Sequence, residues 1–282
     1  MIDWIKVKTQ YILPKHLLSR MVGALAKREL GAVTQFFIKI FIKAFKINMQ
    51  EAAFESPSAY RTFNEFFTRP LKQGARPIDE NDNVLCHPVD GTVSQFGAIN
   101  GDSIFQAKGH QFSLTTLLGG KPELAEVFKG GEFATIYLAP KDYHRIHMPI
   151  DGELTDTLHV PGELFSVNPL TAQNVPGLFA RNERVVALFD TPVGKVAMVL
   201  VGATIVASIE TVWAGNITPP AGKYVQHWQH AKGEVSLKKG DEMGRFKLGS
   251  TVVLCFEPNK INFTDLAVAS TTRMGKPMAE KQ

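Results

Sequence analysis

The sequence predicts an α+β fold, in which helices in residues 1–70 precede a mostly β, barrel-like domain in residues 71–282. Three observations predict it. Apolar residues recur at helical spacing near the N-terminus, whereas short β-branched runs alternate with Gly, Pro and Asp further on. A hydrophobic content of 44% and a charged content of 21% are ordinary for a 282-residue chain that buries a sizeable core.

Two stretches of the N-terminal region have helical spacing. The first begins at Pro14 and is expected to end at Gly31. The second runs from Thr34 to Ile47 and contains eight Phe and Ile residues. Its lysines fall at i, i+4 and i+7, which places them along one stripe of the helix: Lys39, Lys43 and Lys46.

An apolar helix with a lysine stripe is typical of a segment that lies in the interface of a bilayer. The same pattern also fits an ordinary core helix whose lysines face water. Lysines interrupt every apolar run, so we expect no helix of the ~20 apolar residues that span a membrane. We also expect no cleavable signal peptide, because the first 30 residues lack a compact apolar stretch with a small-residue cleavage site.

The charge of the chain is uneven. Residues 1–50 contain nine Lys or Arg against two acidic residues, a net charge of +7, so the remainder of this +4 chain carries −3. A basic N-terminal region predicts an anionic partner. Lipid is favoured over nucleic acid, because the apolar face between the basic residues is too large to leave in water. The two cysteines, Cys86 and Cys255, predict reduced buried thiols in the cytosol.

Residues 55–80 read as a connecting segment with a short helix over Tyr60–Phe67. Beyond it we expect strands at 91–93, 133–138, 185–189, 196–201, 203–209 and 251–256. Residues 88–91 and 149–152 share the pattern Pro-aliphatic-Asp-Gly, which indicates two similar turns.

Three motifs carry side chains suited to chemistry. Asp90 precedes a glycine, and taken alone it is more typical of a turn than of a catalytic site. His144 and His147 are three residues apart and fit either acid–base chemistry or metal binding, as do His227 and His230, although neither pair has a convincing further ligand nearby. Zinc is therefore disfavoured.

The third motif is the Gly249–Ser250 bond. A Gly-Ser pair before a β-branched run is usually a turn into a strand. It also suits a cleavable bond, because glycine leaves its carbonyl open to the following hydroxyl and tolerates a strained backbone.

In this order, the motifs resemble those of the bacterial, pyruvoyl-dependent phosphatidylserine decarboxylases, and the resemblance covers nearly the whole chain. Its central motif is Arg245–Thr251, which resembles the self-processing site of that family. The other matching segments are Tyr60–Pro70, Cys86–Val93, Asp142–Pro149, Val160–Asn168, Ala172–Glu183, Val201–Thr204 and Glu210–Gly215.

The resemblance implies a self-cleaving zymogen with a triad of Asp90, His147 and Ser250. His147 would take the proton of Ser250, and Asp90 would hold the other imidazole nitrogen. Attack on Gly249 would convert the amide to an ester, and elimination would leave a pyruvoyl group at position 250. The products would be a long chain, 1–249, and a short chain, 250–282, which form a heterodimer with higher assembly left open.

The resemblance also implies the reaction: phosphatidylserine forms a Schiff base with the pyruvoyl group, loses CO2 and becomes phosphatidylethanolamine. His144 is the candidate proton donor and substrate-binding residue, and Ser166 is a second candidate for substrate binding. We expect no metal, no pyridoxal phosphate and no nucleic acid. Residues 1–50 would hold the enzyme peripherally on the cytoplasmic side of the cell membrane.

Three alternatives are open. A non-catalytic barrel module that carries lipoyl, biotinyl or phosphoryl groups would suit the repeated Pro-aliphatic-Asp-Gly turn, and predicts one intact chain. A zinc hydrolase would use His144 and His147. A pyridoxal-dependent decarboxylase fits poorly, because no lysine lies in a context typical of a cofactor lysine.

Overall fold

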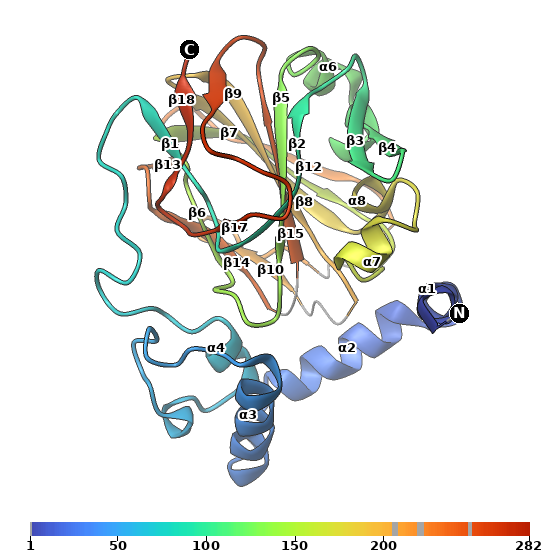
Figure 1. Cartoon of the computed structure of the whole chain (residues 1–282), viewed down its shortest axis with the longest axis vertical. Helices are drawn as coiled ribbons and strands as arrows, with labels where there is room; N and C mark the ends of the chain where they lie inside the picture. Colours follow the sequence, from blue (N-terminus) through green and yellow to red (C-terminus); the bar gives the residue numbers. More distant parts are fainter. Residues whose placement is uncertain (1, 205–207, 219–222, 248–249) are drawn as a thin grey trace.

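The structure is a computed structural model and describes residues 2–204, 208–218, 223–247 and 250–282. Figure 1 shows a body built mainly from strands, with the N-terminal helices beneath one end of it. The α+β class and the mostly β body are therefore confirmed. Within the described ranges, no helix is long and apolar enough to cross a membrane.

The N-terminal region forms three helices: α1 (Ile2–Ile12), α2 (Lys15–Ala26) and α3 (Ala32–Phe45). The break between α1 and α2 falls at Pro14, which cannot donate a backbone hydrogen bond. The expected end at Gly31 of the stretch that begins at Pro14 is wrong, because α2 ends at Ala26. Gly31 instead directly precedes α3, with a φ of 55° that glycine adopts without strain.

A short connection joins these helices to the body. It contains a 3₁₀ turn, η1 (Pro57–Ala59), and α4 (Phe63–Phe67), where the sequence predicts a short helix. The hydroxyl of Thr62 accepts a hydrogen bond from the Glu65 N–H at 3.1 Å and so caps α4. Phe41 of α3 packs edge-on against Phe66 and Phe67, which fixes α4 to α3.

The body is organised around a nine-stranded antiparallel sheet. Its order is β12 (Gln226–Gln229), β7 (Gly152–Val160), β8 (Arg184–Thr191), β9 (Gly194–Val201), β15 (Ser250–Phe256), β5 (Glu132–Leu138), β2 (Gly91–Ala98) and β17 (Thr271–Thr272), with β13 (Ser236–Leu237) also paired to β7. In the described part of the chain this sheet is open, with β12 and β17 at its ends, and the strands close no barrel.

Both faces of the sheet are covered. Along β15, Val253 and Cys255 pack into a core on one face. Val252 and Leu254 alternate with them and pack into a second core on the other face. Burial on both faces explains why residues 252–256 of this strand are continuously apolar.

The first core is covered by a hairpin and four short helices. They are β3 (Ser103–Ala107), β4 (His110–Ser113), α5 (Leu114–Leu117), α6 (Pro122–Glu126), α7 (Pro169–Ala172) and α8 (Leu178–Arg181).

The second core is covered by two small sheets. One contains β11 (Gly215–Asn216), β10 (Ile209–Thr211), β14 (Glu242–Phe246) and β6 (Arg145–His147), and the other contains β1 (Val84–Cys86), β18 (Pro277–Lys281) and β16 (Ile261–Phe263). The strand expected over 203–209 differs, because β10 begins only at Ile209, and residues 205–207 lie outside the described residues.

Candidate active site

Three of the sequence motifs meet at one edge of the large sheet. Neighbouring strands are antiparallel, so the end of β5 lies beside the beginnings of β15 and β2. Ser250 is the first residue of β15, and Asp90 immediately precedes β2. The chain then turns from β5 into β6, where the His147 N–H donates to the Pro88 carbonyl at 2.9 Å. Gly249, the other half of the predicted cleavage site, lies outside the described residues.

Ser250 is fully buried at this edge. Among the residues that the structure describes, its hydroxyl has no hydrogen-bond partner. A buried hydroxyl without a partner is costly, and such groups are typical of functional sites.

His144 is also fully buried, and its ring lies 4.1 Å from the ring of Phe67 in α4. Its Nδ1 lies 2.8 Å from the Asp142 carbonyl oxygen, which can only accept, so Nδ1 carries the proton. Nε2 is then a free acceptor, with no partner in the described structure. Burial, assisted by the positive charge of Arg69, lowers the pKa of His144 to about 3, so its imidazole is neutral at pH 7.

His147 has both ring nitrogens engaged. Nδ1 donates to the Gly240 carbonyl at 2.7 Å, and Nε2 accepts from the Tyr143 hydroxyl at 3.2 Å. Burial lowers the pKa of His147 below its ordinary value, and burial raises that of Tyr143 to about 12. His147 therefore has the tautomer that a general base needs, with its acceptor nitrogen covered by Tyr143.

Asp90 does not hold His147 in the way that the sequence analysis expects. Arg76 donates to both carboxylate oxygens, with Nε 2.9 Å from Oδ1 and 3.0 Å from Oδ2. The Met274 N–H donates to Oδ1 at 2.9 Å. The reason is geometric, because the planar guanidinium fork matches a carboxylate in a way that one imidazole nitrogen cannot. Asp90 acts on His147 only through its charge, which is one of the minor influences on the pKa of that histidine.

The sequence analysis missed several side chains at this edge: Glu51, Arg69, Arg76 and Tyr143. Arg69 and Arg76 lie in the irregular connection after α4, where no periodicity shows which way a side chain points. The adjacent prolines, Pro70 and Pro77, are the one local signal, since they indicate a chain held in a defined path.

The remaining candidate residues have other partners. The Ser166 N–H donates to the side chain of Gln10 at 2.9 Å, and its hydroxyl accepts from Asn168 at 2.8 Å. His227 lies 2.7 Å from a carboxylate oxygen of Asp156. Over the described ranges, no group of three or more His, Cys, Asp or Glu residues is arranged to hold a metal ion.

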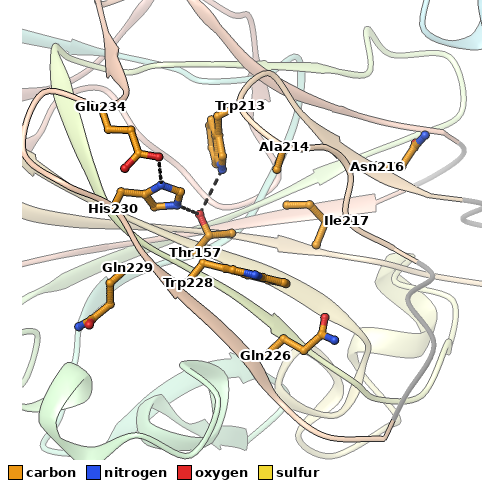
Figure 2. Close-up of a pocket in the computed structure, with 10 residues that line it drawn as sticks. All are labelled: Thr157, Trp213, Ala214, Asn216, Ile217, Gln226, Trp228, Gln229, His230 and Glu234. Carbon is orange, nitrogen blue, oxygen red and sulfur yellow. Dashed lines mark hydrogen bonds and ion pairs between the residues drawn. The ribbon is translucent and has the colours of Figure 1, made fainter.

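A cavity of about 530 Å³ lies elsewhere, between β12 and the turn after β10. Figure 2 shows how its polar groups are used: Thr157 accepts from Trp213 at 3.1 Å and lies 3.0 Å from Nε2 of His230. The other nitrogen of His230 lies 3.4 Å from Glu234. None of the residues that line this cavity belongs to the predicted triad. The polar side chains of Thr157, Trp213 and His230 bond to one another within the cavity wall.

A buried serine at a strand start, two buried histidines and a carboxylate held by arginine are typical of a class of protein, the enzymes that combine nucleophilic and acid–base groups. Comparison with known proteins defines the family. Residues 63–280 match the model described as phosphatidylserine decarboxylase, and residues 5–46 match a second model described as PSD. The chain belongs to the phosphatidylserine decarboxylase family.

Curated relatives agree over the whole chain. A phosphatidylserine decarboxylase proenzyme of Alteromonas mediterranea is 70% identical over 100% of this chain and 87% of its own length. Proenzymes of the same name from Pseudoalteromonas atlantica and Shewanella sediminis are 66% and 60% identical, with 99% of each chain covered.

Proposed function

We propose that this protein decarboxylates phosphatidylserine to phosphatidylethanolamine, after cutting itself before Ser250. Family membership supports the reaction. The observation that carries the assignment to this edge is the pair of buried, unpartnered polar atoms in the described structure, the Ser250 hydroxyl and Nε2 of His144.

Self-processing starts with the Ser250 hydroxyl, which attacks the carbonyl of residue 249 and exchanges the amide for an ester. His147 takes the hydroxyl proton at Nε2, after the Tyr143 hydroxyl has moved aside. Removal of the Cα proton of residue 250 then expels residue 249 as a carboxylate. Addition of water and loss of ammonia complete the pyruvoyl group. Asp90 supports these steps through its negative charge, which favours the imidazolium form of His147.

The site fits a pyruvoyl group at position 250. The position is buried and is the first residue of β15. The Ser250 hydroxyl has no hydrogen-bond partner among the described residues, so its conversion would leave no polar group unpaired there. When formed, the group supplies a conjugated carbonyl that accepts the electron pair released as CO2 leaves.

His144 acts as a base before it acts as an acid. Its low pKa means that it arrives without a proton, so it cannot donate at first. A negative charge on the bound substrate would favour the protonated ring, and His144 would then donate that proton from Nε2 to the carbon that loses CO2. Phe67 on one side and the Asp142 carbonyl on the other hold the ring in place for both steps.

The N-terminal helices support peripheral attachment to the cytoplasmic face of an anionic membrane. In α2 the buried stripe is Lys15, Ser19, Gly23 and Ala26, while the apolar stripe faces outward. Leu17, Met21 and Leu25 are each more than half exposed. In α3, Phe36 and Phe37 are also exposed, beside the lysine stripe. A helix that turns its apolar side outward needs an apolar partner, and acyl chains provide one.

The two product chains are proposed to stay together as a heterodimer. Residues 250–282 contribute β15, which lies between β5 and β9 of the long chain. They also contribute β17 and β18, which pair with β2 and β1. Cutting one bond removes none of these ladders.

The test combines intact-protein mass spectrometry with release of labelled CO2 from phosphatidylserine vesicles. The wild-type chain should be cut between residues 249 and 250 and should release CO2. Ser250→Ala should stay one chain and release none. An uncut wild-type chain that nevertheless releases CO2 would refute the processing step.

The two histidines can be tested separately. His147→Ala should remain uncut. His144→Ala should be cut normally and lose at least ~100-fold in CO2 release, the scale of one acid–base group. An uncut His144→Ala chain would contradict this division of roles.

A further inference from the structure

We propose that Arg69 binds the phosphodiester of the lipid substrate, an inference that rests on the proposed function. Arg69 is 3% exposed, and in the described structure two of its nitrogens, Nε and Nη1, have no hydrogen-bond partner. Within the described ranges only Nη2 is used, donating to the Lys141 carbonyl at 3.2 Å. Buried donors without partners are costly unless a ligand completes them.

A second buried arginine shows what a purely structural one looks like in this protein. Arg184 is 1% exposed, and each of its nitrogens donates to a backbone carbonyl. Nε and Nη1 bond to Leu117 and Asn182 at 2.7 and 2.8 Å, and Nη2 bonds to Thr116. The protein thus engages every nitrogen of one buried guanidinium, whereas two of the three nitrogens of the other have no partner among the described residues.

Arg69 lies beside the edge of the large sheet that holds Ser250 and Asp90, the proposed reactive edge. Its bond to Lys141 attaches it to the turn between β5 and β6, which also holds His144. Phe66 and Phe67 are neighbours in α4, and they cover these two groups separately. The Phe66 ring lies 5.7 Å from the Arg69 guanidinium, while the Phe67 ring lies against His144. Burial lowers the pKa of Arg69, although the nearby Tyr60 and Asp90 oppose this shift.

Arg69 also lies on the side of that edge that faces the N-terminal helices (Figure 1). It directly follows α4, whose aromatic residues pack on Phe41 of α3, and Figure 1 shows α4 between α3 and the sheet body. In phosphatidylserine the phosphate lies between the serine group and the acyl chains. A residue between the reactive edge and the membrane-facing helices is therefore placed to meet the phosphate.

The substrate offers two anions, and catalysis decides between them. The carboxylate loses its charge as CO2 leaves, so a buried arginine on it would stabilise the substrate more than the transition state and slow the reaction. The phosphodiester keeps its charge throughout. Binding it stabilises substrate and transition state equally, which lowers KM without affecting kcat.

The test compares Arg69→Gln with Arg61→Gln, an exposed arginine of the same connection that serves as the matched control. Both variants should be cut at 249/250. With phosphatidylserine in mixed micelles, Arg69→Gln should raise KM about 10- to 100-fold, the scale of a lost charge-assisted pair, and change kcat less than about 3-fold. Arg61→Gln should match wild type.

Inhibition by phosphatidylethanolamine separates the two anions, because this lipid has the phosphate and lacks the carboxylate. Its half-inhibiting concentration should rise by the same factor as KM in Arg69→Gln. An unchanged value would overturn the proposal, and with a raised kcat it would place Arg69 on the carboxylate. If Arg69→Gln does not fold, Arg69→Lys, which keeps the charge and loses the fork, should raise both quantities, and an unchanged pair would again overturn it.

A different result would refute the proposed function itself. Wild-type protein that releases no CO2 from phosphatidylserine would refute that function. Binding of glycerophosphoethanolamine to the processed protein needs no turnover. Weaker binding by Arg69→Gln would still support the phosphate site in that case, and equal binding would overturn it.

Discussion

At the residue scale, Arg76 is the side chain that holds the Asp90 carboxylate. Its guanidinium bridges Asp90 and Glu51, 2.8 Å from the latter, and although burial opposes its charge, the two carboxylates raise its pKa. Arg76 and Asp90 are 8% and 12% exposed, so removing one partner leaves the other charge poorly solvated. In the Ser250→Ala chain, Arg76→Gln should lower the free energy of unfolding by about 2–4 kcal/mol in urea titrations.

Asp90→Asn is the control for that prediction. Added to Arg76→Gln, it removes the unpaired charge and should restore about half of the lost stability. Losses that simply add in the double variant would show that the two residues are not coupled.

Buried histidines make the fold sensitive to acid. Burial lowers the pKa of His87 to about 4, whereas an unfolded histidine titrates at about 6.5. The unfolded chain therefore binds more protons between pH 6.5 and 4. The stability that His87 contributes as a neutral, buried side chain is fully present above pH 6.5 and is lost as the pH falls from 6.5 to 4. His144 acts in the same direction.

Replacing His87 should remove its share of this loss. As the pH falls from 7.5 to 5, the Ser250→Ala parent should lose about 1–2 kcal/mol more unfolding free energy than the same chain with His87→Gln. Urea titrations across this range measure the difference. A gap between the two proteins that does not change with pH would show that His87 is not held neutral by the fold.

At the element scale, the two Pro-aliphatic-Asp-Gly turns perform different tasks. Both end where a strand begins, β2 at Gly91 and β7 at Gly152. However, Asp90 is held by Arg76, whereas Asp151 is half exposed and lies 2.9 Å from Lys238. The same local pattern thus forms one site residue and one surface ion pair.

The glycines of these turns predict unequal costs. A Cβ at Gly91 would lie against the backbone oxygen of Tyr137 in β5, which cannot move without breaking the ladder. A Cβ at Gly152 would first meet the end of the flexible Met148 side chain at 3.0 Å. Gly91→Ala should cost at least ~3 kcal/mol and reduce self-cutting, and Gly152→Ala about 1 kcal/mol. Thermal unfolding and the cut fraction on a gel measure both, and equal losses would contradict the prediction.

Local patterns explain which elements the sequence predicts well. Helical spacing predicts α2 and α3, and β-branched runs predict β5, β8, β9 and β15, because each pattern reports burial of its own segment. The position of Ser250 at a strand start follows from the run after it. The partners of Asp90 do not follow, because Arg76, 14 residues before it, and Met274, 184 residues after it, reach it from irregular segments. Helix ends are likewise uncertain, as Gly31 shows.

At the scale of the whole molecule, the reactive edge and the outward-facing helices lie at the same end. The helices are beneath the end of the sheet where β5 turns into β6, while β3 and β4 lie at the far side (Figure 1). Lys15 attaches α2 to the body, since its ammonium lies 2.9 Å from Glu163 and 3.9 Å from the centre of the Phe165 ring. One of the nine basic residues near the N-terminus thus serves the fold rather than a membrane.

This arrangement predicts how single residues of α3 contribute to vesicle binding. Phe36 is 60% exposed, and burying one such side chain in lipid contributes about 1.5–3 kcal/mol. Phe36→Ser should therefore weaken partitioning of the Ser250→Ala chain by about 10- to 100-fold in sedimentation with vesicles. Lys39→Gln should weaken it about 5-fold on anionic vesicles and leave binding to zwitterionic vesicles unchanged, because its contribution is Coulombic.

Phe105 of β3 provides the matched control. It is 39% exposed and belongs to the β3–β4 hairpin, which Figure 1 shows on the upper flank of the body, away from α2 and α3. Phe105→Ser makes the same chemical change and should leave partitioning within a factor of about 2, because a face turned away from the bilayer buries nothing there. Equal losses for Phe36→Ser and Phe105→Ser would mean that vesicles bind the protein without orientation. The reactive edge would then not be directed at the lipid surface by its helices.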